Sequence, residues 1–232
     1  MPTLNEIASD IRNIASSGKE NYSMRIEDEN IFFWINEARS KFISEALIKR
    51  EQLSDIWLQT ISCLEMIQVD ESECCFITTG CYVLRSKEKL PPTIETNNDN
   101  SIVKVVTATG LIIDKGNAFN NLYVAHNKYT AKKPMWYLQN GYLYITNEQL
   151  IDYLTVYALF EDPSDLADFI NCSGDTCFSI DSPYPCSLKM ANDITNYVIR
   201  AKVLPFYSTI PDKSNDANSE DGMKNPSGLT QR

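Results

Sequence analysis

The sequence predicts an α+β fold in which N- and C-terminal helices pack together around an inserted antiparallel β-sandwich or barrel, with an extended C-terminal tail. Three observations support this prediction. Near both ends of the chain, apolar residues recur every three or four positions, which is the period of an amphipathic helix. Between residues 56 and 159 the period falls toward two, which is typical of strands. Beyond residue 211 apolar residues are scarce, and the segment is too polar to fold alone.

These changes of period also predict the domain boundaries. We expect a helical part formed by residues 1–54 and 160–205, an inserted β-rich domain of residues 55–159, and a polar tail of residues 206–232 that orders on a partner.

The N-terminal region contains two predicted helices. Thr3 and Glu6 form a capping-box pattern at the start of the first one. The second covers about residues 28–50 and can be capped by Asp28 or Asn30. We expect the apolar stripe of this second helix to face the core. It comprises Ile31, Trp34, Ile35, Ala38, Phe42, Ala46 and Leu47.

The strongest local signal in the middle region is a β-hairpin. Asn140-Gly141 lies between two runs rich in aromatic and branched residues, 135–139 and 142–146, and both turn residues tolerate positive φ. Pro91-Pro92 and residues 97–100 predict an exposed loop. Further strands are expected at residues 61–69, 76–79, 82–85, 102–109, 111–114 and 153–159.

Helices are expected again after the β-rich region. Asp162 is a suitable N-cap, and Pro163 then occupies the first helical position, where its missing N–H costs nothing. A final helix is predicted over about residues 187–204 and should end at Pro205.

Composition and charge exclude several functional classes. The chain has 232 residues, a formal net charge of −10 and one histidine, His126. The acidity argues against an independent binder of duplex DNA or of anionic membranes. Sites that need two imidazoles are ruled out. No stretch approaches the roughly 20 apolar residues of a membrane span, and no export signal is visible, so we expect a soluble chain made in the cytosol.

The seven cysteines favour reduced thiols. Their number is odd, and without an export signal a disulfide framework is not expected. No C-x-x-C pair is present, so the sequence predicts no zinc site. The cysteines are Cys63, Cys74, Cys75, Cys81, Cys172, Cys177 and Cys186.

Motifs for nucleotide or metal chemistry are also missing. Neither glycine-rich phosphate-loop pattern occurs. Asp162, Asp165 and Asp168 are spaced like a carboxylate cluster, but capping and solvation explain them more simply. The tail's resemblance to a calcium loop fails because Asp221 stands where glycine is required. We therefore expect no cofactor, no metal and no enzymatic activity.

Several segments resemble a known family. Residues 25–39 contain a W-I-N-x-x-R core, from Trp34 to Arg39. The segments 82–91 and 103–109, the aromatic hairpin 135–146, the Glu161-Asp162-Pro163 turn and the Asp212…Asn215-Asp216 tail are also similar. Together they resemble the ring proteins, or head-to-tail connectors, of crAss-like, podovirus-type tailed phages.

The resemblance implies a structural virion protein of the neck or tail, assembled in the host cytoplasm. By family analogy, twelve copies would form a ring below the portal, joining capsid to tail and forming part of the DNA channel. Its partners would be its own copies, the portal protein, neighbouring tail ring proteins and, non-specifically, double-stranded DNA, with no membrane. The candidate interface residues are Trp34, Arg39, Trp136, Tyr137, Tyr142, Tyr144, Asp212, Asn215 and Asp216.

Two other classes of function remain open at this point. The β-rich domain could be a non-enzymatic binding module of a phage tail that contacts carbohydrate or a receptor, with Trp136 and the nearby tyrosines as the ligand platform. A hydrolase would have to be built on His126, paired with a catalytic cysteine. The patch formed by Lys128, Lys132 and Lys133 is too small to bind nucleic acid against the net charge.

Overall fold

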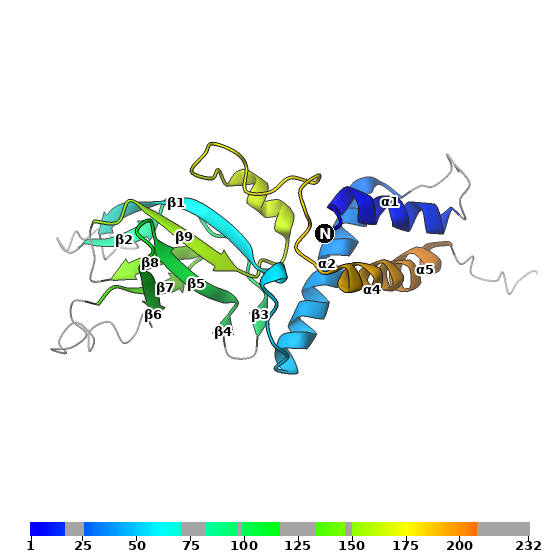
Figure 1. Ribbon diagram of the computed structural model, residues 1–232, viewed down its shortest axis with the longest axis horizontal. Helices are drawn as coiled ribbons and strands as arrows, with labels where there is room; N and C mark the ends of the chain where they lie inside the picture. The colour runs from blue at the N-terminus through cyan, green and yellow to red at the C-terminus, as the bar shows by residue number, and fades with distance from the viewer. Residues whose placement is uncertain (17–25, 71–81, 97–98, 117–132, 147–149, 208–232) are drawn as a thin grey trace, which may run out of the picture.

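A computed structural model describes residues 1–16, 26–70, 82–96, 99–116, 133–146 and 150–207. A β-barrel lies at one end of the molecule and a group of helices at the other (Figure 1). The predicted α+β class is confirmed, with helices at the N-terminus and near the C-terminus. Some features predicted from the sequence lie outside the described residues. These are the strand at 76–79, the calcium-like segment, His126, Lys128, Lys132, Cys74, Cys75 and Cys81.

Helix α1 (Leu4–Ala15) has the predicted capping box. The Thr3 hydroxyl accepts the Glu6 N–H at 3.1 Å, and a Glu6 carboxylate oxygen accepts the Thr3 N–H at 2.9 Å. One face of the helix, formed by Leu4, Ile7 and Ile11, is buried. The capping-box pattern therefore predicts where this helix begins, and the apolar period predicts its buried face.

Helix α2 (Asp28–Ile48) differs from its prediction at the cap. Neither Asp28 nor Asn30 caps it, because the N-cap position is Glu27, whose side chain makes no capping hydrogen bond. Asp28 instead pairs with Arg12 of α1, so its charge joins two helices. Ile31, Ile35, Ala38, Ile43 and Ala46 are buried, whereas Trp34 and Phe42 are partly buried against the same core.

Helix α4 (Leu188–Val198) begins at Ser187, whose hydroxyl accepts the Met190 N–H at 3.2 Å. The predicted stop at Pro205 is wrong. A π-helical turn, η3 (Ile199–Val203), follows α4, and α5 (Leu204–Tyr207) continues through the proline. A proline lacks a donor and crowds the preceding turn of an α-helix, and a π turn is one of the irregularities that accommodate such a break.

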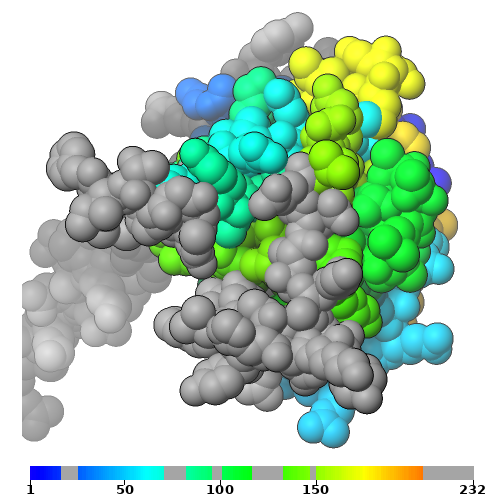
Figure 2. Space-filling model, turned by 90° about the vertical axis from the view of Figure 1, so that its left-hand side faces the viewer, coloured from blue at the N-terminus to red at the C-terminus, as the bar shows by residue number. Residues whose placement is uncertain are grey.

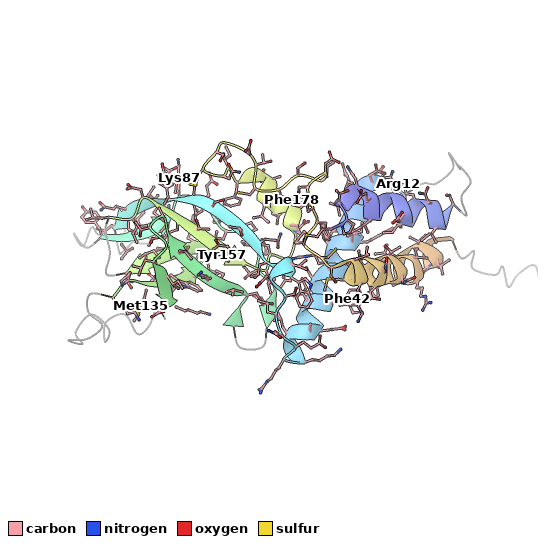
Figure 3. All side chains as sticks on the ribbon, viewed as in Figure 1. Arg12, Phe42, Lys87, Met135, Tyr157 and Phe178 are labelled. Carbon is pink, nitrogen blue, oxygen red and sulfur yellow. A yellow bond between two sulfur atoms is a disulfide. The ribbon has the colours of Figure 1, made fainter. Side chains whose placement is uncertain are left out.

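The helices contact one another in the right-hand part of Figure 1. The rings of Phe42 (α2) and Tyr197 (α4) meet edge to face with centroids 5.8 Å apart, and Phe42 is labelled beside α4 in Figure 3. Lys202 of η3 forms an ion pair with Glu37 of α2 at 2.8 Å. These contacts join segments that lie about 160 residues apart in the sequence.

Seven strands form the closed barrel in the order β1-β2-β8-β7-β6-β5-β9. Pairing is antiparallel except between β6 and β7, which are parallel, so the prediction of a wholly antiparallel unit is wrong at this one pair. The strands are β1 (Gln59–Asp70), β2 (Tyr82–Ser86), β5 (Ile102–Thr107), β6 (Ile112–Lys115), β7 (Met135–Gln139), β8 (Tyr142–Thr146) and β9 (Tyr153–Ala158). Outside the barrel, β3 (Glu95–Thr96) pairs with β4 (Asp99–Asn100), and η1 (Asp55–Trp57) precedes β1.

The predicted hairpin is confirmed. Asn140 and Gly141 have φ values of 53° and 81°, the two positive angles that a tight β-hairpin turn requires. The register then pairs Tyr137 with Tyr144 on one face and Trp136 with Ile145 on the other. Because side chains alternate along a strand, the two faces of the hairpin meet different environments.

The segment expected to form an exposed loop is exposed at Pro92 but packed on either side of it. Pro91 and Ile94 are buried, and the Ile94 N–H donates to the Leu159 carbonyl at 2.9 Å. The Glu161 N–H donates to the Pro92 carbonyl at the same distance. The backbone after Pro91 is therefore paired with the residues that follow β9, a long-range pairing that local composition does not reveal.

The expectation of reduced cysteines is also wrong at one pair. Cys63 and Cys172 form a disulfide, with Cα atoms 5.2 Å apart. The fold brings together two positions separated by 109 residues, so their spacing in the chain does not indicate the pair. Cys177 is half-buried and Cys186 buried, and both are free.

Two further features concern the described residues alone. No group of three or more histidine, cysteine, aspartate or glutamate side chains in these segments is arranged to hold a metal ion. None of the helices in this part of the chain combines the length and apolar character that crossing a bilayer requires.

We expect Thr3→Ala to lower the free energy of unfolding by about 1 kcal/mol, because the first turn of α1 loses its cap. Thr3→Ser keeps the hydroxyl and should retain nearly all of the stability. Urea denaturation measures both variants, and the midpoint should shift without a change in slope. Equal stability of Thr3→Ala and the unsubstituted chain would show that the capping box contributes nothing.

Candidate functional site

The candidate site is the junction at which the helices meet the barrel, and Arg39 lies at its centre. The side chain is 0% exposed and reaches from α2 into the interior. Its Nε donates to the Pro185 carbonyl at 3.0 Å, and Nη1 donates to the Phe160 carbonyl at 2.9 Å. Its Nη2 donates to the Trp57 carbonyl at 3.0 Å and to Oε1 of Gln59 at 3.3 Å.

The three carbonyl groups come from three separate passages of the chain that meet at Arg39. Trp57 precedes β1, Phe160 follows β9, and Pro185 precedes α4. The planar guanidinium offers five donors in a fixed arrangement, so a single side chain can orient all three passages. Arg39 therefore links the barrel and the helices within the chain.

Electrostatics around Arg39 follow from burial. Desolvation lowers the pKa of Arg39 below its ordinary value, yet a guanidinium remains protonated inside proteins. The guanidinium carbon of Arg39 lies 5.9 Å from the centre of the Tyr184 ring. Burial also raises the pKa of the Tyr184 hydroxyl, which therefore stays neutral and donates a hydrogen bond.

Asn36 forms the second half of the junction. Its Nδ2 donates to Oδ1 of Asp162 at 2.7 Å, and its Oδ1 accepts from the Tyr184 hydroxyl at 2.6 Å. The same Asp162 oxygen accepts the Ser164 N–H at 2.7 Å. The predicted capping role of Asp162 is confirmed, although the element it caps, η2 (Pro163–Asp168), is a 3-10 helix.

The other two carboxylates of this segment belong to Asp165 and Asp168. The pKa of Asp165 is raised, first by desolvation and then by the neighbouring charges of Asp162 and Asp168. All three lie on one short turn and face solvent or the cap, as capping and solvation predict.

The aromatic residues proposed as interface side chains lie mainly inside the subunit. Trp136 is 2% exposed and Tyr144 8% exposed, so neither offers a free ring. Tyr137 stacks on Tyr144 with centroids 5.1 Å apart and an interplanar angle of 7°. The Arg85 guanidinium lies 4.2 Å from the Tyr142 ring centre. Burial removes Trp136 as a surface platform for a sugar ring.

The other candidate residues divide into two groups. Trp34 is half-buried against the helical core, and Arg39 is completely buried in the junction. Asp212, Asn215 and Asp216 lie outside the described residues. The structure thus brings Arg39 together with the ends of the barrel strands and separates it from the aromatic hairpin.

Sequence reasoning missed one exposed surface on α2, the Phe33 surface. Phe33 is 62% exposed beside a groove of about 340 Å³, lined also by Asn36, Glu37, Ser40, Glu161 and Asp162. Phe33 falls outside the predicted stripe, and an aromatic residue off the core-facing stripe is the signal that could have identified it.

A second exposed apolar surface lies on the barrel and is called the β5–β6 surface. Val103, Leu111 and Ile112 are 50%, 57% and 53% exposed. Figure 2 shows this part of the chain, in green, on the side of the barrel. Lys104 projects from the same strand and lies 5.8 Å from the Tyr157 ring centre.

The sequence matches the model of a family described as phage tail ring protein 2 over residues 6–222. The chain belongs to this family of crAss-like phage tail ring proteins. No curated protein matches it. The ring protein is therefore a structural component of the virion tail, and its family implies assembly into an oligomeric ring with other tail proteins. The matched residues include the complete junction and both exposed surfaces.

We expect Arg39→Met in the ring protein to lower the free energy of unfolding by about 3–5 kcal/mol, because several buried acceptors lose their donor. Arg200→Met, at an exposed position of η3, is the matched control and should change stability by less than about 0.5 kcal/mol. Chemical denaturation measures both. A loss below about 1 kcal/mol for Arg39→Met would contradict the connecting role.

Proposed function

We propose that the ring protein forms a closed ring of twelve copies below the portal, joins capsid to tail, and surrounds part of the DNA channel. The family match over residues 6–222 carries this proposal. The proposed role is purely structural, with assembly in the host cytoplasm. A closed ring requires two unlike surfaces on each subunit, because every copy contacts its neighbours head to tail.

The proposed division of the chain supplies such surfaces. The helical part, residues 1–54 and 160–205, carries the Phe33 surface, and the barrel domain, residues 55–159, carries the β5–β6 surface. The Arg39 junction holds the two at a fixed angle. Exposed apolar groups in both places are typical of protein interfaces. We propose that the Phe33 surface of one copy contacts the β5–β6 surface of the next.

Charge supports this pairing. The rim of the Phe33 groove bears Glu37, Glu161 and Asp162, whereas the β5–β6 surface includes Lys104. Over the sequence both parts are net acidic, with 16 acidic against 10 basic side chains in the helical part and 11 against 8 in the barrel domain, so the opposite charges are confined to the two surfaces. Opposite charges around an apolar contact fix its register. An acidic wall would also repel DNA phosphates and let the duplex pass.

The polar tail is proposed to order on a neighbouring ring or on the portal. Residues 212–221 contain four acidic side chains and one lysine, so they account for −3 of the net charge. A polar segment can extend the reach of a subunit and gain order on a partner. Asp212, Asn215 and Asp216 are its candidate contact residues.

We expect native mass spectrometry of the full chain, alone and with the portal protein, to give a ring of twelve copies. Negative-stain images should show the same ring. A chain ending at Ile210 should fold equally well but bind the portal or a neighbouring ring more weakly. A subunit that stays monomeric under all of these conditions would contradict the proposal, and unimpaired assembly of the shortened chain would remove the docking role of the tail.

We expect Phe33→Asp and Ile112→Asp each to prevent ring closure, because each places a charge in an apolar contact. Their mixture is the sharper test. Each variant retains one intact surface, so the pair should form a single contact and stop at a heterodimer. Native mass spectrometry distinguishes this product from rings and monomers.

Leu188→Asp is the control, because Leu188 is 69% exposed on α4 and does not line the Phe33 groove. This variant should assemble normally. Complete rings from either interface variant would show that its surface lies outside the ring contact. A mixture that yields only monomers would show that the two surfaces do not meet each other.

A further inference from the structure

A short hairpin follows η2 and lies over the outside of the barrel. Its strands are joined by a bridge between Ile170 and Thr176, and its turn is organised by Asn171. Oδ1 of Asn171 accepts the Ser173 N–H at 2.8 Å and the Asp175 N–H at 3.0 Å. These bonds all lie within the turn of the hairpin. We call residues 170–177 the Cys172 hairpin.

The barrel meets this hairpin at an irregularity in β1. The register between β1 and β9 shifts between Ile61 and Leu64, and Cys63 within the shift has a φ of 58°. A bulge of this kind re-aims a side chain, and here it aims Cys63 at Cys172. The disulfide therefore joins the tip of a surface hairpin to strand β1 of the barrel.

Two cavities border this connection. One, of about 280 Å³, is lined by Glu65, Lys87 and Ile170. The other, of about 340 Å³, is lined by Val106 and Tyr153 and includes both bonded cysteines. The disulfide borders this open space and ties the tip of the hairpin to β1. At the base of the hairpin, Phe169 and Phe178 are buried in the core, and Cys177 makes a hydrogen bond with the backbone of Ser62 in β1.

The free thiols in the described residues exchange slowly with this disulfide. Burial raises the pKa of Cys177, which lies in the hairpin itself, and raises that of Cys186 to about 11. A thiol attacks a disulfide as its thiolate, so both are largely unreactive near neutral pH. The pairing of Cys63 with Cys172 is therefore protected against internal exchange from these two positions.

We propose that Cys63 and Cys172 form a redox-controlled latch that fixes the Cys172 hairpin to the barrel. In reducing solution both are thiols and the hairpin is released. Oxidised glutathione closes the latch in two steps. One cysteine attacks it to give a mixed disulfide and one glutathione, and the other cysteine then displaces the second glutathione. The protein loses two electrons and two protons, and one molecule of oxidised glutathione becomes two of the reduced form. A virion that leaves a reducing interior for an oxidising exterior would carry the latch closed.

The test uses the full-length protein in native buffers poised with reduced or oxidised glutathione. Alkylation followed by peptide mass spectrometry should find both cysteines modified in the reducing buffer and linked to each other in the oxidising one. Hydrogen exchange should slow by about tenfold or more across residues 170–177 on oxidation. Exchange in the barrel strands and in α2 should remain unchanged.

Cys172→Ser should remove the redox dependence of exchange, and Cys177→Ser, a cysteine change in the same hairpin, should preserve it. Cys63→Gly provides a second latch variant, since glycine accepts the positive φ at this position. Linkage of Cys63 or Cys172 to another cysteine would overturn the proposal, as would alkylation of both in the oxidising buffer. Hairpin exchange that is the same in both buffers would equally overturn it.

Discussion

The arrangement of the ring protein depends on one buried cation. Burying a charge is costly, and it is tolerated here because Arg39 donates to three backbone carbonyls and to Gln59. Those carbonyls need a donor as much as the guanidinium needs acceptors, since a buried polar group without a partner is costly. Gln59 reinforces the arrangement, because its Oε1 also accepts the Phe160 N–H at 3.0 Å. The barrel and helices are thereby held in one relative orientation.

A fixed orientation matters for a subunit of a ring. Ring closure requires each contact to repeat the same rotation, and an error in that angle accumulates around the circle. A flexible link between barrel and helices would let the angle vary. The junction instead combines Arg39 with the chain of bonds from Tyr184 through Asn36 to Asp162. The redox latch acts elsewhere, on a surface hairpin, so the state of the latch need not alter this angle.

Features encoded locally were predictable from the sequence. The Thr3 capping box, the Asn140-Gly141 turn and the Asp162 cap each depend on residues a few positions apart, and each was confirmed. Features that depend on distant neighbours were not. The Cys63–Cys172 bond needs a bulge in β1 to face a later hairpin, and the packing of Pro91 needs the end of β9. The helix passes Pro205 because η3 precedes it, and composition alone does not indicate a π turn.

The motif that first indicated the family could be mistaken for a surface that contacts other subunits. Two polar residues of the W-I-N-x-x-R core, Asn36 and Arg39, lie three positions apart and therefore on one face of α2. A polar pair on a helix suggests exposure, yet these residues are 4% and 0% exposed because their partners are carbonyl, hydroxyl and carboxylate groups of the junction. The exposed aromatic residue is Phe33, just before the motif. A recognisable motif in this protein therefore marks the interior that orients the subunit, and contacts between subunits must be sought beside it.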